Sequence, residues 1–395
     1  MDKKEKVLLL LLAVVQFCHI VDFMVLMPLG PTLLRLFKIG TQEFGMLISI
    51  YTLAAAIMNI VGAFFLDRMD RKKALQVFFV GFILGTLMCA LSESYIMLLI
   101  ARGLTGAFGG LVNSTVLSIV ADNFAVEKRG RAMGFIMTTF SVASIVGVPF
   151  SLWLAGLFKW EAPFYFLVGL SLLALIILSF YLSPQRKHLQ NQVKTSPFLP
   201  FKEALFDTNQ SFALLFMFFL MLGHFMIIPF LSPVMVGNFG IAEKHLPLIY
   251  LFGGGANFFA TPMIGKWVDK KGRLPVFITF LFLSFIPVFA LTHLGQTSLF
   301  IALLFTTLLF ITSSGRMVPA MDISASAVIM QKRGSFMGIS MALQHLAITI
   351  GTSVAGYIIF VEPSGRMQNF QIVGYMSMGF VLLSLFFGRR VKVRG

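Results

Sequence analysis

The sequence predicts an all-α integral membrane protein with twelve transmembrane helices. Of its 395 residues, 58% are hydrophobic and only 12% are charged, and the mean hydropathy is +0.90, far above that of a soluble globular chain. Apolar runs of about 20 residues recur from end to end, which is long enough to cross a ~30 Å hydrocarbon core as helices. None shows the alternating pattern of a membrane β-barrel.

Short polar loops separate the predicted spans, and their charges predict the orientation. If the N-terminus is cytoplasmic, 24 of the 31 Lys and Arg residues fall in inner segments and five in outer loops. This bias predicts that both termini are cytoplasmic. The net charge of +15 therefore reports topology rather than nucleic-acid binding. The expected spans are 7–29, 44–66, 74–92, 95–121, 131–157, 162–182, 208–237, 246–267, 274–293, 297–326, 335–361 and 370–388.

The spans divide into two related halves. We expect a six-helix bundle over 1–182, a cytoplasmic linker over 183–207 and a second six-helix bundle over 208–395. At an offset of 202 residues, Asp67 matches Asp269 and Arg71 matches Arg273. Two duplicated bundles around a central site are the architecture of a secondary transporter.

Four motifs resemble the major facilitator superfamily. They are the loop 63–73 (AFFLDRMDRKK), its repeat 265–273 (GKWVDKKGR), the fourth-span segment 102–110 (RGLTGAFGG) and the fifth-span entry 122–134 (DNFAVEKRGRAMG). Together they look most like the bacterial drug:proton antiporter and sugar-efflux branch. Ala63 and Asp70 stand where that branch has glycines, and 148–151 (VPFS) lacks the glycines of its span-5 signature.

Asp22 is the one acidic residue deep within a predicted span. An ionised side chain at the bilayer centre costs about 2.5–3.5 kcal/mol even on insertion scales, so such residues are commonly functional. His19 lies one turn earlier on the same helical side. Asp22 is therefore a candidate coupling acid and His19 a candidate for the proton path; the alternative is that Asp22 only forms a structural salt bridge.

Arg102, in span 4, lies at the same predicted depth as Asp22, so the two can meet. The resemblance implies proton coupling for Arg102; the alternative is an anchor for backbone carbonyls. At the offset of 202 residues, His224 in span 7 corresponds to Asp22. His224 is a second proton-path candidate, although a lone intramembrane histidine is more often a hydrogen-bonding residue.

Arg316 lies in span 10, on one helical face with Thr306 and Ser313. It either binds an anion or a sugar hydroxyl, neutralises Asp322, or belongs to an inner gate. Other polar candidates for the substrate cavity can equally form helix–helix hydrogen bonds. They are Tyr51, Asn113, Asn257 and Gln344.

The charged loops resemble a cytoplasmic gate, in which Asp70, at an expected glycine, indicates an altered latch. Prolines near the outer ends of spans 1 and 7 and the run 253–255 (GGG) in span 8 are expected bending points. The gate residues are Asp67, Arg68, Arg71, Asp122, Arg131, Asp269, Gly272 and Arg273. The prolines are Pro28, Pro31, Pro229 and Pro233.

No Gly-rich phosphate loop, metal-binding pair or nucleophile motif is visible, so we expect no enzyme, cofactor or metal site. Cys18 and Cys89 are expected to be packing residues. The sequence favours a monomeric, proton-coupled efflux antiporter for small apolar or amphipathic compounds in the bacterial inner membrane. The alternatives are a sugar or organic-anion transporter organised around Arg316, or a receptor or lipid-handling protein on the same scaffold.

Overall fold

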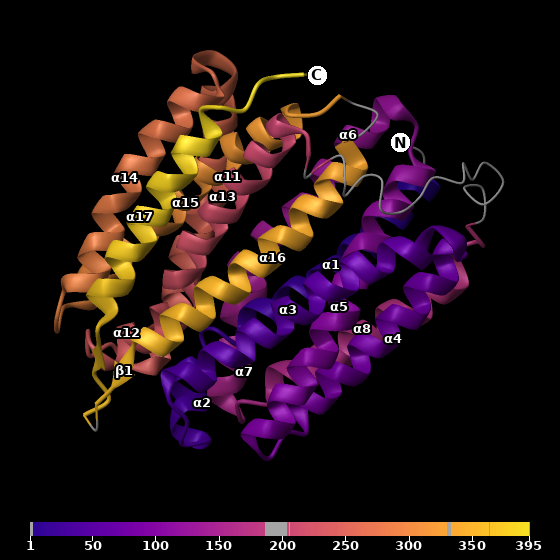
Figure 1. The fold of residues 1–395 in the computed structure, drawn as a ribbon. Coiled ribbons are helices and arrows are strands. Elements are labelled where there is room, and N and C mark those ends of the chain that lie inside the picture. The colour runs from indigo at the N-terminus through magenta and orange to yellow at the C-terminus, as the bar shows by residue number, and fades with distance from the viewer. Residues whose placement is uncertain (1–2, 186–203, 205, 330–332, 363, 395) are drawn as a thin grey trace. The chain divides into compact units, whose positions relative to one another are not determined.

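The computed structural model describes residues 3–185, 204, 206–329, 333–362 and 364–394, and nearly all of them are helical (Figure 1). In this part of the chain, twelve stretches are long and apolar enough to span a membrane. The predicted all-helical membrane fold is confirmed. The helices are α1 (Lys3–Val25), α2 (Gly30–Leu36), α3 (Thr41–Phe65), η1 (Leu66–Arg68), α4 (Arg71–Ala90), α5 (Tyr95–Asn123), α6 (Val126–Val142), η2 (Ala143–Gly147), α7 (Val148–Leu157), α8 (Ala162–Tyr181), α11 (Thr208–Ile227), η3 (Ile228–Phe230), α12 (Leu231–Gly237), η4 (Glu243–His245), α13 (Leu246–Lys271), α14 (Arg273–His293), α15 (Leu299–Ser326), α16 (Arg333–Ile358) and α17 (Phe370–Gly388).

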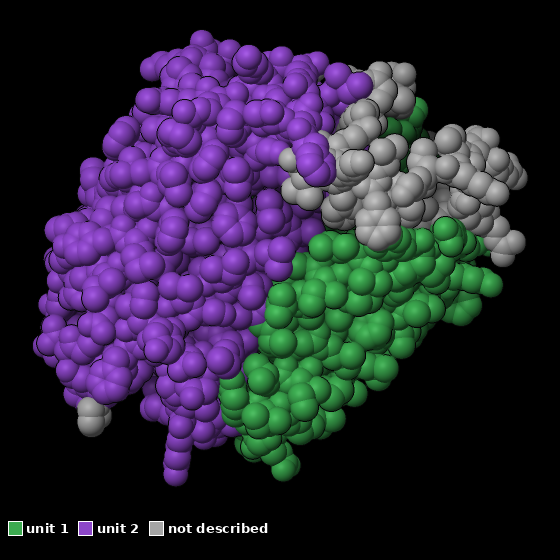
Figure 2. Space-filling view, in the orientation of Figure 1, with its two compact units in different colours: residues 1–26, 50–197 green, residues 27–49, 198–395 purple. Residues whose placement is uncertain are grey.

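The chain forms two compact units, 1–26 with 50–197 and 27–49 with 198–395 (Figure 2). In the second unit, the antiparallel strands β1 (Phe360–Val361) and β2 (Met367–Gln368) join α16 to α17. The predicted division into 1–182 and 208–395 stays a prediction, because most of the linker 183–207 lies outside the described residues.

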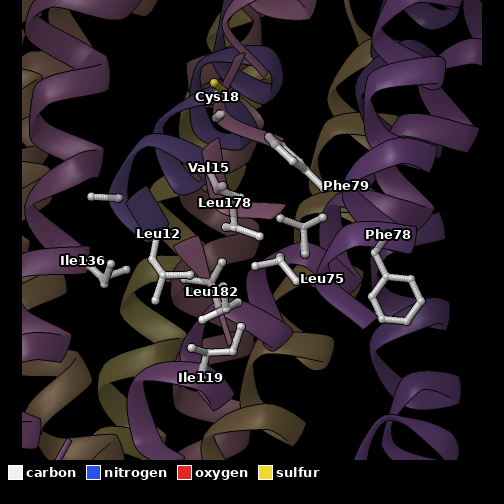
Figure 3. Close-up of a cluster of buried hydrophobic side chains, with 14 of the residues drawn as sticks. Leu12, Val15, Cys18, Leu75, Phe78, Phe79, Ile119, Ile136, Leu178 and Leu182 are labelled. Carbon is white, nitrogen blue, oxygen red and sulfur yellow. The ribbon is translucent and has the colours of Figure 1, made fainter. Parts of the chain in front are cut away.

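An apolar core holds the first unit together (Figure 3). Leu12 and Cys18 of α1 pack among side chains of α4, α5, α6 and α8, and both are fully buried. In a membrane such a core is held by close van der Waals packing, because the surrounding lipid is as apolar as the side chains themselves. Cys18 is a free thiol in this core. Other core members labelled in Figure 3 are Val15, Leu75, Phe78, Phe79, Ile119, Ile136, Leu178 and Leu182.

Glycines let α5 approach its neighbours closely. A Cβ on Gly106 would lie 2.2 Å from the backbone oxygen of Tyr51 in α3, which no real atom pair tolerates. A Cβ on Gly85 of α4 would lie 2.6 Å from the Oγ1 of Thr105 in α5. Small residues at such contacts are how membrane helices gain packing without a hydrophobic driving force. The glycines of the segment 102–110 thus place the α5 side chains that matter below.

The fifth predicted span is not a regular helix. The backbone N–H of Val148 bonds the carbonyl of Ala143, five residues back, so 143–147 forms one π-helical turn. Pro149 follows directly and has no N–H to donate, which removes one regular helical bond at this place. The segment 148–151, which departs from the antiporter signature, therefore begins at a backbone irregularity.

In the second unit, α11, α14, α15 and α17 share an apolar core that includes Phe216, Phe277 and Ile323, and these helices lie side by side in Figure 1. Residues 27–49 belong to the same unit. Thr41 of α3 donates to the carbonyl of Ile359 at 2.5 Å, and Ser353 of α16 donates to Ser49 at 2.8 Å. The first half of α3 is thus hydrogen-bonded along α16.

The expected bending points have different outcomes. α1 ends at Val25 before Pro28, and α11 gives way to the 3-10 turn η3 at Ile228, before Pro229. These breaks fit the expectation for Pro28 and Pro229, whereas Pro31 lies within α2 and Pro233 within α12. The run 253–255 lies inside α13, which is continuous from Leu246 to Lys271, so bending there stays a prediction. Glycine retains its backbone N–H and can therefore continue a helix, which proline cannot do without losing a bond.

Candidate functional site

A buried ion pair joins α1 to α5 in the first unit. The Nη1 of Arg102 lies 2.9 Å from the Oδ2 of Asp22 and donates also to the Asp22 backbone carbonyl at 3.2 Å. Neither side chain has any exposed surface. Thr86 of α4 donates to the other carboxylate oxygen at 3.2 Å. The two residues whose predicted depths matched do meet. Arg102 also binds a backbone carbonyl, as its structural interpretation expects, and its role in proton coupling stays a prediction.

Tyr51, on α3, packs its ring against the guanidinium of Arg102. Its ring centroid lies 4.4 Å from the Arg102 Cζ, a cation–π contact. The Tyr51 hydroxyl is buried and has no hydrogen-bond partner among the described residues. His19 lies near Tyr51, with 6.4 Å between ring centroids. Tyr51, a predicted cavity residue, therefore lies near both the Arg102 guanidinium and the His19 ring.

Polar contacts continue along α1 from this point. Gln16 is one turn from His19, and its Nε2 donates to the Oδ1 of Asn113 in α5 at 2.8 Å, with both side chains buried. The stripe 16, 19 and 22 on α1 thus faces α5, as its helical spacing predicts. Asn113 makes the helix–helix hydrogen bond that was its alternative interpretation.

Thr86 is a functional-site residue that the sequence did not indicate. Threonine is common in membrane helices, and its hydroxyl usually returns to its own backbone, as in Thr105, which donates to the carbonyl of Ala101 at 2.7 Å. Only the position of α4 shows that Thr86 instead reaches Asp22. No sequence pattern distinguishes these two situations.

The chemistry of this site follows from the complete burial of both charges. Each charge of a buried pair has lost its hydration, and the pair survives because each ion compensates the other. If Arg102 moves away, Asp22 is left as an uncompensated charge in a low-dielectric environment, and taking up a proton removes that cost. Breaking the pair and protonating Asp22 are therefore thermodynamically linked. This is the property that a proton-coupling site requires.

Equivalent ion pairs occur in the two charged loops. Arg71 Nε lies 3.3 Å from Asp122 Oδ2 in the first unit, and Arg273 Nε lies 2.6 Å from Asp322 Oδ2 in the second. Arg71 also donates to the carbonyl of Leu66 at 2.9 Å. Arg71 and Arg273 are related by the offset of 202, and their acidic partners are related by an offset of 200, near the ends of α5 and α15. Both units therefore contain this ion pair, although the two offsets differ.

The remaining gate residues lie around these pairs. Asp70 is the N-cap of α4: its Oδ1 accepts from the backbone N–H of Lys72 at 2.9 Å and from that of Gln185 at 3.1 Å. Its place at an expected glycine thus has a structural reason. Gly272 has φ +87° between α13 and α14, which favours glycine. Arg68, Arg131 and Asp269 are exposed, and the Asp67 side chain is outside the described part.

Arg316, in α15 of the second unit, is another buried arginine. It is 3% exposed, and its one described hydrogen bond runs from Nη2 to the Oγ of Ser313 at a long 3.5 Å. Its expected neutralisation of Asp322 is wrong, because Asp322 pairs with Arg273. His224 of α11 lies close enough to Arg316 for the two to interact electrostatically.

The last two cavity candidates also lie in the second unit. Asn257 on α13 is half-buried, and its backbone carbonyl accepts from Thr261 at 2.7 Å. Gln344 on α16 donates to the Oγ of Ser340 at 3.0 Å. In the described ranges, no group of three or more His, Cys, Asp or Glu side chains is placed to hold a metal ion.

Comparison with known proteins agrees with this architecture. The sequence model of the Major Facilitator Superfamily matches residues 12–352 and 213–394. The uncharacterized MFS-type transporter YceJ of Bacillus subtilis (strain 168) is 24% identical over 362 residues, which are 91% of this chain and 90% of that protein. Two solved structures share the fold with a TM-score of 0.75 and 15% identity each. They are a bacterial homologue of the human lysosomal transporter Spinster, inward-facing and unoccupied (98% of this chain, 97% of that one), and a mutant of the nucleoside transporter NupG (98% and 99%).

Proposed function

The chain belongs to the major facilitator superfamily, and from this premise we propose that it is a proton-coupled efflux antiporter for small apolar or amphipathic compounds. As a member of this family it is a multi-pass membrane transporter and not an enzyme. It binds small molecules and moves them by alternating access, without a chemical step.

The ion pair between Asp22 and Arg102 carries the proposal of proton coupling. Both side chains are fully buried, 2.9 Å apart, so Asp22 is stable as an anion only while Arg102 stays beside it. A conformational change that separates α1 from α5 makes Asp22 take up a proton, and the return change releases it. A membrane potential of 100 mV supplies about 2.3 kcal/mol for each charge that moves in this way.

His19 and Tyr51 are the proposed route to this site. Tyr51 touches the guanidinium and lies 6.4 Å from His19 between ring centroids, so a proton that reaches His19 is one side chain away from the pair. Histidine is the side chain whose ordinary pKa suits proton exchange near neutral pH. His224 has a different setting, next to Arg316. We therefore assign the proton path to the first unit.

The ion pairs of Arg71 with Asp122 and of Arg273 with Asp322 are the proposed gate. They lie at helix ends that the charge bias places in the cytoplasm. The similarity to a bacterial protein over 91% of the chain supports a bacterial inner membrane. We propose that the protein works there as a monomer, with both termini cytoplasmic and Asp67 as a further gate residue.

Transport into proteoliposomes tests the proposal. A thermal-shift screen of chemically diverse compounds against the purified protein first supplies a ligand. With the membrane potential clamped, an imposed pH gradient should drive accumulation of that ligand, and collapsing the gradient should abolish it. Accumulation that follows the membrane potential alone, or mere equilibration, contradicts proton coupling. Absence of exchange even in counterflow would indicate a receptor instead.

A further inference from the structure

Arg316 is a buried cation without a described counter-ion. Its side chain lies ten residues before the end of α15 at Ser326, about 15 Å along the helix axis. The residue is 3% exposed, and its Nε has no hydrogen-bond partner among the described residues. The one bond it makes, to Ser313 Oγ at 3.5 Å, is at the limit of hydrogen-bond length. Arg316 is therefore not fixed to backbone carbonyls in the described structure.

None of the described acidic residues of the second unit forms an ion pair with Arg316. Asp322, the acid on the same helix, is six residues away, about 9 Å along the axis, and is bound to Arg273. Asp207 pairs with Arg394, and Glu243 with Arg35. All the described acidic residues of this unit lie in loops or within a few residues of helix ends. They are Glu43, Asp207, Glu243, Asp269, Asp322 and Glu362.

Arg102 shows what Arg316 lacks. Arg102 is equally buried but meets the Asp22 carboxylate at 2.9 Å. An isolated buried charge loses its hydration without compensation, which costs several kcal/mol. A protein that keeps such a charge needs an anion from outside the chain to compensate it, at least in one state of its cycle. A membrane arginine with unused donors is a candidate site for that anion.

We propose that Arg316 binds the acidic group of the transported compound, which is an amphipathic organic carboxylate. This inference rests on the proposed transport function and names its substrate class. The guanidinium fork matches a carboxylate through two parallel N–H donors. Ser313, one turn away, offers a hydroxyl on the same face, and the nearby His224 offers a ring nitrogen from α11.

The side chains around Arg316 favour an anion that also carries an apolar group. The buried residues that share its helical face within two turns are four apolar ones and two hydroxyl-bearing ones. They are Leu309, Pro319, Ala320 and Ile323, and Thr312 and Ser313. Two of them, Ala320 and Ile323, pack in the apolar core with α11. A small, strongly hydrated anion would lose its water here without apolar contacts to offset the loss. An aromatic or aliphatic acid brings its own apolar surface.

Binding to the full-length protein in nanodiscs tests this with three probes of equal size. Phenylacetate is the anion, phenylacetamide the neutral analogue and phenethylamine the cation, each at about 10 mM in a thermal-shift assay. We expect phenylacetate to raise Tm and the other two to have little effect. Equal stabilisation by all three, no stabilisation by phenylacetate, or equal stabilisation by sodium sulfate would overturn the proposal.

Variants separate a binding role from a structural one. Arg316→Met keeps the volume and removes the charge, so it should raise Tm in the absence of ligand and abolish the phenylacetate shift. Arg316→Lys should retain the charge and weaken binding about tenfold, since the fork is lost. Arg366→Met, which removes an exposed arginine of the same unit, is the control and should behave as wild type. A lower Tm for ligand-free Arg316→Met indicates a structural anchor and contradicts the proposal.

The assay needs no gradient, so it is independent of proton coupling. If phenylacetate binds through Arg316 but no pH gradient drives its transport, the substrate class stands and the proposed coupling is wrong. If pH-driven transport is found for neutral or cationic compounds, and is unchanged in Arg316→Met, the coupling stands and the substrate class is wrong.

Discussion

The carboxylate of Asp22 lies 2.9 Å from the guanidinium of Arg102, and neither side chain has exposed surface. The contact joins α1 to α5 at a depth where water cannot solvate either charge. Gly106 lets α5 approach the backbone of Tyr51 in α3, whose ring packs on the Arg102 guanidinium. The ion pair is thus a product of helix packing, and its energetics can be measured separately from transport.

Removing one partner of this pair should cost more stability than removing both. Arg102→Met leaves Asp22 without compensation in a dry site and should destabilise the protein by about 3–5 kcal/mol. The double variant Asp22→Leu with Arg102→Met buries no charge and should recover most of the loss. Denaturation in a mild detergent, followed by circular dichroism, measures both. If the two losses add, the charges do not interact in the folded protein.

Gly106→Ala should lower stability by about 1–3 kcal/mol. The added methyl group would lie 2.2 Å from the backbone oxygen of Tyr51, so α3 and α5 must separate. Gly103→Ala is the matched control on the same helix, since its methyl group would meet only the Cγ1 of Ile50 at 3.4 Å. Thermal unfolding should show a clear loss for Gly106→Ala and little change for Gly103→Ala. Equal effects would refute the close approach.

The pair of Arg273 with Asp322 should matter for transport more than for stability. Its side chains are 34% and 46% exposed, and exposed ion pairs contribute about 0–1 kcal/mol. Asp322→Asn should therefore leave Tm nearly unchanged while slowing transport severalfold, and the swap Arg273→Asp with Asp322→Arg should restore part of the rate. Unchanged transport in Asp322→Asn would remove this pair from the proposed gate.

Asp207, outside the membrane spans, should give an acid-dependent contribution to stability. Its partial burial acts to raise its pKa, but hydrogen bonds from Arg394 at 2.5 Å and from the backbone N–H of Gln210 at 3.0 Å hold the pKa below its usual value. The stabilisation is therefore present above the unfolded-state pKa of about 3.9 and disappears as the pH falls through the lower folded value.

Asp207→Asn keeps the acceptor oxygen and removes the charge, so it isolates this contribution. The difference in Tm between wild type and Asp207→Asn should be present near pH 6 and should vanish toward about pH 3. The difference should be small, because the Asp207 side chain is 27% and that of Arg394 44% exposed. A Tm difference that does not change over this range would show that the charge is not involved.

Much of the fold follows from the sequence because hydropathy and span length are nearly sufficient in a membrane. The depth of a residue along its helix can also be predicted from the sequence, and the matching depths of Asp22 and Arg102 predict that they meet. The rotation of one helix relative to its neighbour cannot be predicted from a single sequence. The sequence therefore does not predict that Tyr51 packs on Arg102 or that Thr86 reaches Asp22, while the place of Tyr51 in a substrate cavity stays a prediction.

Local backbone chemistry explains the other differences. Asp70 was interpreted against an expected glycine, although an aspartate two residues before Lys72 is also a regular N-cap. The glycines 253–255 lie inside α13, which continues through them because glycine keeps its backbone N–H. Asp322 was a possible partner of Arg316 from sequence distance alone. Its actual partner, Arg273, comes from the preceding loop, at the place that the duplication gives to Arg71.

The pH-driven transport of Asp22→Asn tests the central claim most directly. Asparagine keeps the shape and the hydrogen bond from Thr86 but cannot exchange a proton. In proteoliposomes, gradient-driven accumulation should fall at least tenfold, while counterflow of the same ligand stays within about threefold of wild type, as should both activities in the control Glu93→Gln, which changes an exposed acid of the same unit. Full gradient-driven accumulation by Asp22→Asn would contradict proton coupling through the buried pair.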